Sequence, residues 1–276
     1  MRTSNQHIPK SCLFCEAPLD NRNKSREHVI PAWLAQHLGV TNELIAPNHR
    51  SSKTWKILSS RKQTVDELLE GRVCKTCNTG WMSNLESSIQ SLLVQLMRTE
   101  EHVRELAPEQ HLQLARWACK TAWVLNSSSN FHHNVPQAHF RHLYDDKDSL
   151  PPGVIVVAQQ HSSTRRFSWI QAATWPAEIS EDMTEAQVET LSSDSYKIGL
   201  QFGDLMLLVA FWPHDGWYYS LQINSHIPLW PVRGMCGWHS GTGWQPEDSE
   251  RALYGFHAAL MIVNETRLKR CEHWAG

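Results

Sequence analysis

The chain has 276 residues and a formal net charge of −2, and 41% of its residues are hydrophobic, which allows one large or two ordinary domains with a sizeable core. Its longest strongly apolar stretch, Leu205–Trp212, is far too short to cross a bilayer as a helix, and the polar start MRTSNQHIPK lacks the apolar run of a signal peptide. The sequence therefore predicts a soluble, cytoplasmic protein with no membrane partner.

The small net charge hides an asymmetry along the chain. Residues 1–80 contain 12 Lys and Arg against 7 Asp and Glu, whereas residues 81–276 contain 14 against 21. A basic segment on an acidic body favours contact with a polyanion such as nucleic acid, although a difference of this size can also arise by chance.

Four of the seven cysteines form two Cys-x-x-Cys pairs, Cys12 with Cys15 and Cys74 with Cys77. Four thiolates in two such pairs bind Zn²⁺ tetrahedrally in closed structural sites, which leave no coordination position open for chemistry. Two unrelated thiol pairs, or a redox Cys-x-x-Cys, are the alternatives. We predict one structural zinc ion that contributes folding free energy to the polar N-terminal unit.

The segment between the two cysteine pairs predicts little regular structure. Residues 27–39 begin extended, and after Pro31 they predict a helix that stops at Gly39. Residues 40–65 are polar and rich in Ser, Asn, Lys and Arg, and we interpret them as an insertion or a mobile loop.

Helices are predicted behind the second cysteine pair. Ser83 and Glu86 match the S-x-x-E capping box, and an apolar stripe then predicts a helix to Met97. Pro108 opens a second helix with one apolar face, and a shorter helix is predicted near residues 136–144.

From Pro151 onward the pattern changes to strands. Gly203-Asp204 and Asp215-Gly216 predict tight hairpin turns between them. The predicted strands are residues 153–160, 165–175, 195–202, 204–212 and 217–223. The remaining predicted elements are a short helix near 183–192, a loop rich in Trp, Pro and Gly at 228–248, and a terminal helix over 249–270.

The segment SREHVIP, residues 25–31, places Glu27 directly before His28. Adjacent strand residues point to opposite faces, so a distorted strand end could set both side chains around one phosphate. His28 suits the general base that activates a nucleophile, and Glu27 suits a ligand for a hard divalent cation. Asn78 could complete that ion's coordination or, alternatively, cap the helix behind it.

Basic residues surround these candidates in the sequence. Each of them alone is typical of a solvated surface residue, but the group favours contacts with phosphates. The residues are Arg22, Lys24, Arg26, Arg72 and Lys75.

The order Cys-x-x-Cys, Glu-His-x-Ile-Pro, Cys-x-x-Cys-Asn resembles the HNH, or ββα-metal, nucleases of the treble-clef zinc-finger type over about the first 90 residues. This resemblance implies that His28 is the general base and that Glu27 and Asn78 bind Mg²⁺ or Mn²⁺. The middle Asn of the family pattern is missing before the second cysteine pair. Asp66 could substitute for it, but the sequence does not assign that role.

The whole chain also resembles single-chain bacterial antiphage effectors, including the ring-activated zinc-finger RNase. This resemblance implies an endonuclease that cleaves RNA, forms a homo-oligomer, and is activated by a phage protein sensed by residues 100–276. A DNA-specific HNH endonuclease, a non-catalytic zinc-finger protein that binds nucleic acid, and an assembly protein with a purely structural finger are the alternatives.

Together the elements and the resemblance predict an α+β fold in two domains. Residues 1–99 are expected to form the treble-clef, HNH-like zinc-finger unit. Residues 100–276 are expected to form a helical connector and a β-rich domain that ends in a helix.

Overall fold

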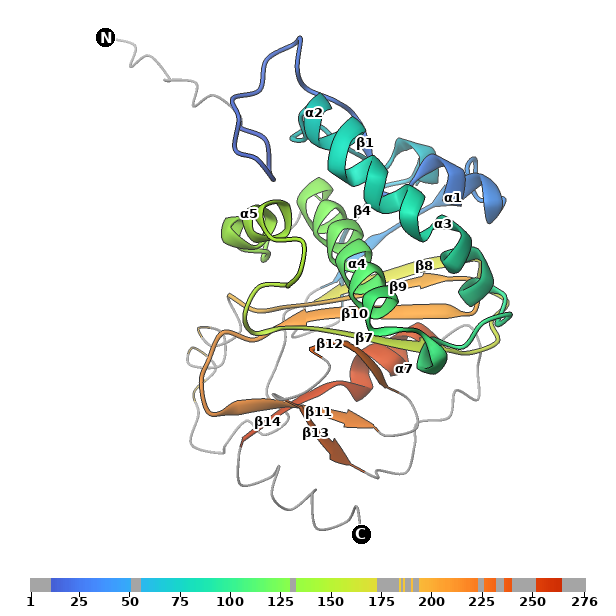
Figure 1. Ribbon diagram of the computed structural model, residues 1–276, viewed down its shortest axis with the longest axis vertical. Helices are drawn as coiled ribbons and strands as arrows, with labels where there is room; N and C mark the ends of the chain where they lie inside the picture. The colour runs from blue at the N-terminus through green and yellow to red at the C-terminus, as the bar shows by residue number, and fades with distance from the viewer. Residues whose placement is uncertain are drawn as a thin grey trace.

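The computed structural model shows a mixed helix and sheet protein with the N-terminal unit at one end, a long helix beneath it, and two sheets below that helix (Figure 1). The residues that the structure describes are 11–50, 56–129, 133–172, 184, 186, 190, 194–222, 226–231, 236–239 and 252–264.

The N-terminal unit is built on a strand pair too short to form a core alone. β1 (Glu27–His28) pairs antiparallel with β6 (Leu69–Glu70). After Pro31, α1 (Ala32–His37) ends just before Gly39, the predicted stop, whose φ of +66° favours glycine.

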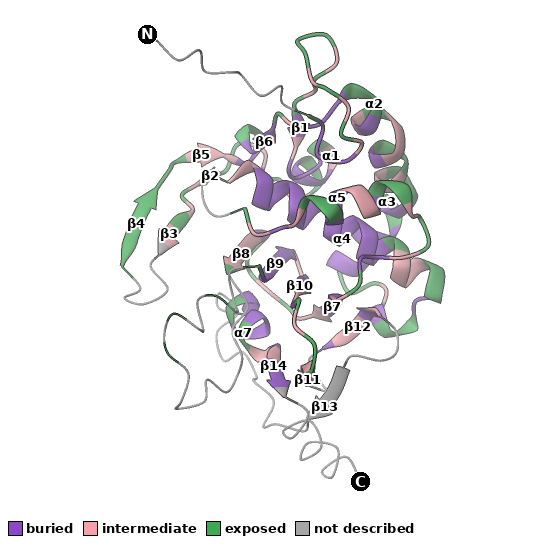
Figure 2. Cartoon of the chain, turned by 90° about the vertical axis from the view of Figure 1, so that its left-hand side faces the viewer, coloured by how far each residue is buried: buried purple, intermediate pink, exposed green. Residues whose placement is uncertain are grey.

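The segment predicted as an insertion or mobile loop forms two further strand pairs. β2 (Leu44–Ile45) pairs with β5 (Gln63–Thr64), and β3 (Asn48–Arg50) pairs with β4 (Ile57–Ser60). We call residues 44–50 and 56–64 the arm, because β3 and β4 project from the body of the molecule in Figure 2. The arm leads directly into a 3₁₀ turn, η1 (Val65–Glu67).

The helix behind the second cysteine pair begins earlier than predicted. α2 (Lys75–Cys77), a π turn η2 (Asn78–Met82) and α3 (Ser83–Met97) follow one another with a kink at Gly80. The predicted capping box of Ser83 and Glu86 is therefore wrong, because the backbone at Met82 is already helical and no side chain caps α3. Glu86 contacts the next long helix instead.

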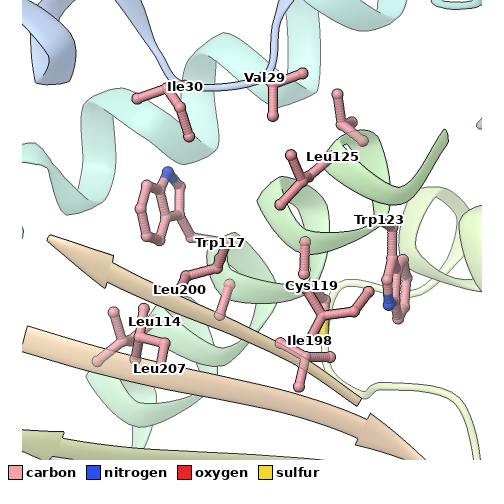
Figure 3. Packing of buried hydrophobic residues seen from close by; sticks show 14 of the residues in the cluster. Val29, Ile30, Leu114, Trp117, Cys119, Trp123, Leu125, Ile198, Leu200 and Leu207 are labelled. Atoms are coloured by element: carbon pink, nitrogen blue, oxygen red, sulfur yellow. The ribbon is translucent and has the colours of Figure 1, made fainter. Parts of the chain in front are cut away.

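That helix, α4 (Pro108–Ser128), occupies the centre of the fold. Residues 114–127 are all buried, which is expected of a helix covered on every side. Figure 3 shows Trp117 of α4 between Leu200 of the sheet and the chain at Ile30. A short turn, η3 (Val103–Glu105), precedes α4, and α5 (Gln137–Asp145) follows it as predicted.

Five antiparallel strands in the order β12-β7-β10-β9-β8 form the main sheet. Alternate residues of β10 face different cores: Leu207 packs in the core that includes α4, whereas Leu208 packs with α7 (Ala252–Ala259). The sheet is therefore buried on both faces. Its strands are β7 (Val154–Gln160), β8 (Phe167–Ala172), β9 (Tyr196–Phe202), β10 (Leu205–Phe211) and β12 (Ile227–Trp230).

A second sheet has three strands in the order β13-β11-β14. β11 (Trp217–Gln222) pairs in parallel with β13 (Cys236–His239) and antiparallel with β14 (Met261–Asn264). The helix predicted over 249–270 is observed at Ala252–Ala259, but the prediction is wrong at Met261–Asn264, which pairs with β11 as an edge strand.

The two predicted hairpin turns have different outcomes. Gly203, with φ of +56°, joins the paired strands β9 and β10 as predicted. The prediction for Asp215-Gly216 is wrong, because the turn at Gly216 leads the chain from one sheet to the other. The helix predicted near 183–192 and most of the loop predicted at 228–248 lie outside the described residues.

One hydrophobic core joins the N-terminal unit to the rest of the chain. Its buried residues extend from Cys12 to Leu229 and include α3, α4 and one face of the main sheet. Residues on both sides of the predicted domain boundary at residue 99 thus contribute to the same continuous core. In the described part of the chain, no helix is long and apolar enough to span a membrane.

Candidate functional site

The four paired cysteines converge on one point. The Sγ atoms of Cys12, Cys15, Cys74 and Cys77 all lie within 4.8 Å of one another, and those of Cys15 and Cys74 are 3.6 Å apart. Tetrahedral zinc with Zn–S bonds of about 2.3 Å separates its sulfur ligands by about 3.8 Å. The cysteines are thus positioned to hold a metal ion, which is consistent with the predicted structural zinc.

Backbone hydrogen bonds hold the two cysteine turns together. The amides of Cys74 and Cys77 donate to Cys12 Sγ (3.4 Å) and Cys74 Sγ (3.3 Å), respectively. A hydrogen bond from the Cys77 thiol lowers the pKa of Cys12 to about 4, and the same hydrogen bond, with burial, raises the pKa of Cys77. Burial also raises the pKa of Cys15, so without a metal ion Cys12 is the cysteine of this group that favours the thiolate. A thiolate at neutral pH is the form that binds zinc.

We expect one zinc ion per chain, and we expect the Cys74→Ser variant to lose it and to unfold the N-terminal unit, because the metal links the two cysteine turns that lie on either side of β1 in the sequence. Elemental analysis of freshly purified protein checks the first point, and circular dichroism checks the second. Cys119→Ser is the control, since Cys119 is buried in α4 outside the cluster and its replacement should leave the zinc content at one. Zinc-free wild-type protein would refute this prediction.

His28 faces an acidic side chain that the sequence left unassigned. His28 Nε2 lies 3.3 Å from Asp66 Oδ1, and the two side chains are 38% and 54% exposed. Asp66 is held in η1, whose capping box includes a hydrogen bond from the Thr64 amide to Glu67 Oε2 (2.8 Å). The structure therefore brings together a solvent-accessible imidazole and a carboxylate that can orient it.

Glu27 points to the opposite side of β1 from His28. Its side chain is buried, and Glu27 Oε1 lies 2.7 Å from Nζ of Lys120, which is fully buried in α4 and lies 2.5 Å from Glu86 Oε1. Burial lowers the pKa of Lys120, but attraction and hydrogen bonds from Glu27 and Glu86 outweigh it, so the pKa is raised. This geometry argues against the predicted role of Glu27 as an open ligand for Mg²⁺, since an ammonium ion already neutralises it.

A second buried acid lies beside this ion pair. Glu70 is the register partner of Glu27, and its carboxylate accepts hydrogen bonds from Ser127 Oγ (2.6 Å) and from the backbone amide of Arg72 (2.8 Å). The Arg72 guanidinium also donates to Ser127 Oγ. Arg72 therefore ties β6 to α4, and the structure does not support its predicted contact with phosphate.

Asn78 braces the chain that leads into β1. Its amide nitrogen donates to Ser25 Oγ (3.2 Å), and that hydroxyl donates to the carbonyl of Val73 (2.9 Å). Asn78 thus connects the second cysteine turn to the segment that carries His28. The other four predicted phosphate-binding residues, Arg22, Lys24, Arg26 and Lys75, are exposed.

Sequence reasoning missed Lys120, Glu86 and Glu70 as parts of this site. The available signal was Lys120 itself, which follows the apolar residues Trp117, Ala118 and Cys119 in the helix, because a buried Lys requires an acidic partner. Which acid it pairs with depends on packing between α3, α4 and β1, which local patterns do not specify.

No protein-family model, curated protein or solved structure matches the chain. The function is therefore inferred from the chemistry of the site.

Proposed function

We propose that the protein is an endonuclease that cleaves RNA, with His28 as the general base and Asp66 as the group that orients it. The observation that supports this most is the His28–Asp66 contact of 3.3 Å on the accessible side of β1. A carboxylate that accepts a hydrogen bond from Nε2–H leaves Nδ1 as the proton acceptor. The zinc-finger unit would hold this pair in place in an HNH-like, treble-clef arrangement.

The burial of Glu27 favours an RNA substrate. Hydrolysis of DNA by the HNH route uses a divalent cation at the leaving oxygen, and the predicted ligand for that cation is paired with Lys120. RNA supplies its own nucleophile. His28 would remove the proton of the 2′ hydroxyl, the 2′ oxygen would attack phosphorus, and the 5′ oxygen would leave and take a proton from water.

The alternative route uses Glu27 and Asn78 as ligands of Mg²⁺ or Mn²⁺ and an activated water as nucleophile. It would cleave DNA as well as RNA and leave 5′-phosphate ends. It requires Glu27 to leave Lys120, so we rank it second. The cysteines would hold a structural zinc ion in either case and take no part in the reaction.

The proposed role of the rest of the chain is regulatory. Residues 100–276 would respond to a phage protein and to self-association and so control the nuclease, as the resemblance to antiphage effectors implies. The continuous core offers a physical path, because α4 contacts both the main sheet and the strand that carries His28.

Incubation of the protein with RNA and DNA of the same sequence, with and without EDTA, tests the proposed activity. We expect cleavage of RNA alone, retained activity in EDTA while elemental analysis shows that zinc stays bound, and 2′,3′-cyclic phosphate and 5′-hydroxyl ends. RNA with 2′-O-methyl groups at every position should resist cleavage. Loss of activity in EDTA with 5′-phosphate ends would favour the metal route, and no cleavage of either substrate would refute the nuclease proposal.

A further inference from the structure

We infer that the arm, residues 44–50 and 56–64, is a binding surface for single-stranded nucleic acid that lays the strand beside the His28–Asp66 pair. The guidance of a substrate to this pair rests on the proposed function, whereas binding by the arm can be measured without cleavage.

The charge of the arm is entirely positive. Residues 44–65 contain five Lys and Arg and no Asp or Glu, in a chain whose net charge is −2. The five residues are Arg50, Lys53, Lys56, Arg61 and Lys62. In the described part of the arm, the side chains of Lys56, Arg61 and Lys62 are exposed. Cations with no acid between them in the sequence attract a phosphate backbone, because each phosphate that they neutralise releases counterions.

The arm also exposes apolar side chains. Leu44, Ile57 and Leu58 are 64%, 52% and 60% exposed, and all four residues of β4 are exposed. Single-stranded nucleic acid presents unstacked bases that pack against protein side chains, whereas a duplex keeps its bases stacked inside. The combination of cations and uncovered apolar side chains on one hairpin therefore fits a single strand better than a duplex.

The arm is attached beside the candidate catalytic pair. β5 ends at Thr64, two residues before Asp66, and the amide of Asp66 donates to the carbonyl of Thr41 (3.3 Å) at the other end of the arm. Arg166, in the loop before β8, contacts the chain just before the arm. Its guanidinium lies 3.0 Å from Glu43 Oε2 and donates a hydrogen bond to the carbonyl of Gly39 (2.9 Å). Figure 2 shows the arm extending outward from the region of β1 and β6. A single strand of nucleic acid bound along the arm would thus reach His28 where the arm joins the rest of the protein.

Fluorescence anisotropy with a short labelled single-stranded RNA tests the inference. The His28→Ala background keeps the RNA intact. The triple variant Lys56→Ala/Arg61→Ala/Lys62→Ala should bind at least about tenfold more weakly at low salt, and the slope of log affinity against log salt should fall by about 2, since each phosphate contact on a single strand contributes about 0.7. The exposed triple variant Arg98→Ala/Arg104→Ala/Lys147→Ala removes equal charge outside the arm and should leave the slope unchanged.

A second variant tests the contacts between apolar side chains and nucleic-acid bases separately from the contacts between cations and phosphates. Ile57→Ser/Leu58→Ser should weaken RNA binding with no change in salt slope, and it should affect a duplex of the same sequence less. Unchanged RNA binding in the arm triple variant, or an equal loss in the control triple variant, would overturn the inference. So would arm-dependent binding to phosphatidylserine vesicles without any effect on RNA binding. If the wild-type protein cleaves nothing but the arm variants lose RNA binding, the proposed nuclease function fails while the binding surface stands.

Discussion

Replacement of His28 by Ala is expected to reduce RNA cleavage by about 10²–10⁴-fold, the usual contribution of a general base. The fold and the zinc content should stay unchanged, because the His28 side chain is 38% exposed and its ionic contact is with Asp66, which is not one of the four cysteines. Single-turnover rates measure the loss, and circular dichroism with elemental analysis measures the integrity of the protein.

The control for this prediction is His37→Ala. His37 is an exposed histidine at the end of the neighbouring helix α1, so its removal tests whether any nearby imidazole matters. Asp66→Asn should reduce cleavage less than His28→Ala, because it keeps the imidazole but removes the charge that stabilises its protonated form. Near wild-type cleavage by the His28→Ala variant would exclude His28 as the base.

The cysteine cluster and the change from extended chain to helix at Pro31 could be predicted from the sequence because their signals are short. Two Cys-x-x-Cys turns each direct both of their thiols to one side, where the four can meet around one ion. Pro31 separates an extended segment from a helix, because its ring restricts the residue before it. The long helices α3 and α4 were also predictable, since apolar periodicity over many residues outweighs errors at the ends.

The remaining parts of the site depend on contacts between distant segments. Asp66 meets His28 only because β6 pairs with β1 and η1 turns back toward that strand. Side chains alternate along a strand, and this predicted that Glu27 points to the side opposite His28. No local pattern, however, identifies Lys120 as the partner of Glu27. The strand at Met261–Asn264 likewise forms because β11 offers it an edge, not because its own sequence excludes a helix.

Replacement of Lys120 by Met is expected to lower the free energy of unfolding by about 3–5 kcal/mol, the usual loss when one partner of a buried ion pair is removed. The variant would leave the carboxylates of Glu27 and Glu86 beside each other without the cation between them. Urea denaturation at neutral pH measures the effect. The exposed control Lys147→Met should change stability by at most about 0.5 kcal/mol.

The double variant Lys120→Met/Glu27→Gln distinguishes loss of charge pairing from loss of packing. It removes one of the two unpaired carboxylates, so it should recover part of the stability lost in Lys120→Met.

Because folding raises the pKa of Lys120 above its usual value of 10.5, the stabilisation by the ion pairs of Lys120 is present at neutral pH and is lost only as the pH rises through the folded-state pKa.

The single variant Lys120→Met also separates the structural role of Glu27 from its predicted role as a metal ligand. If Glu27 only anchors β1 to α4, Lys120→Met should reduce RNA cleavage in proportion to the unfolded fraction, and Mn²⁺ should not restore it. If Glu27 binds a catalytic ion, freeing its carboxylate from Lys120 should make cleavage by the folded fraction stronger and dependent on Mn²⁺. Unchanged stability in Lys120→Met would instead mean that solvent or another cation reaches Glu27 and Glu86, and the anchoring of the His28 strand by α4 would be refuted.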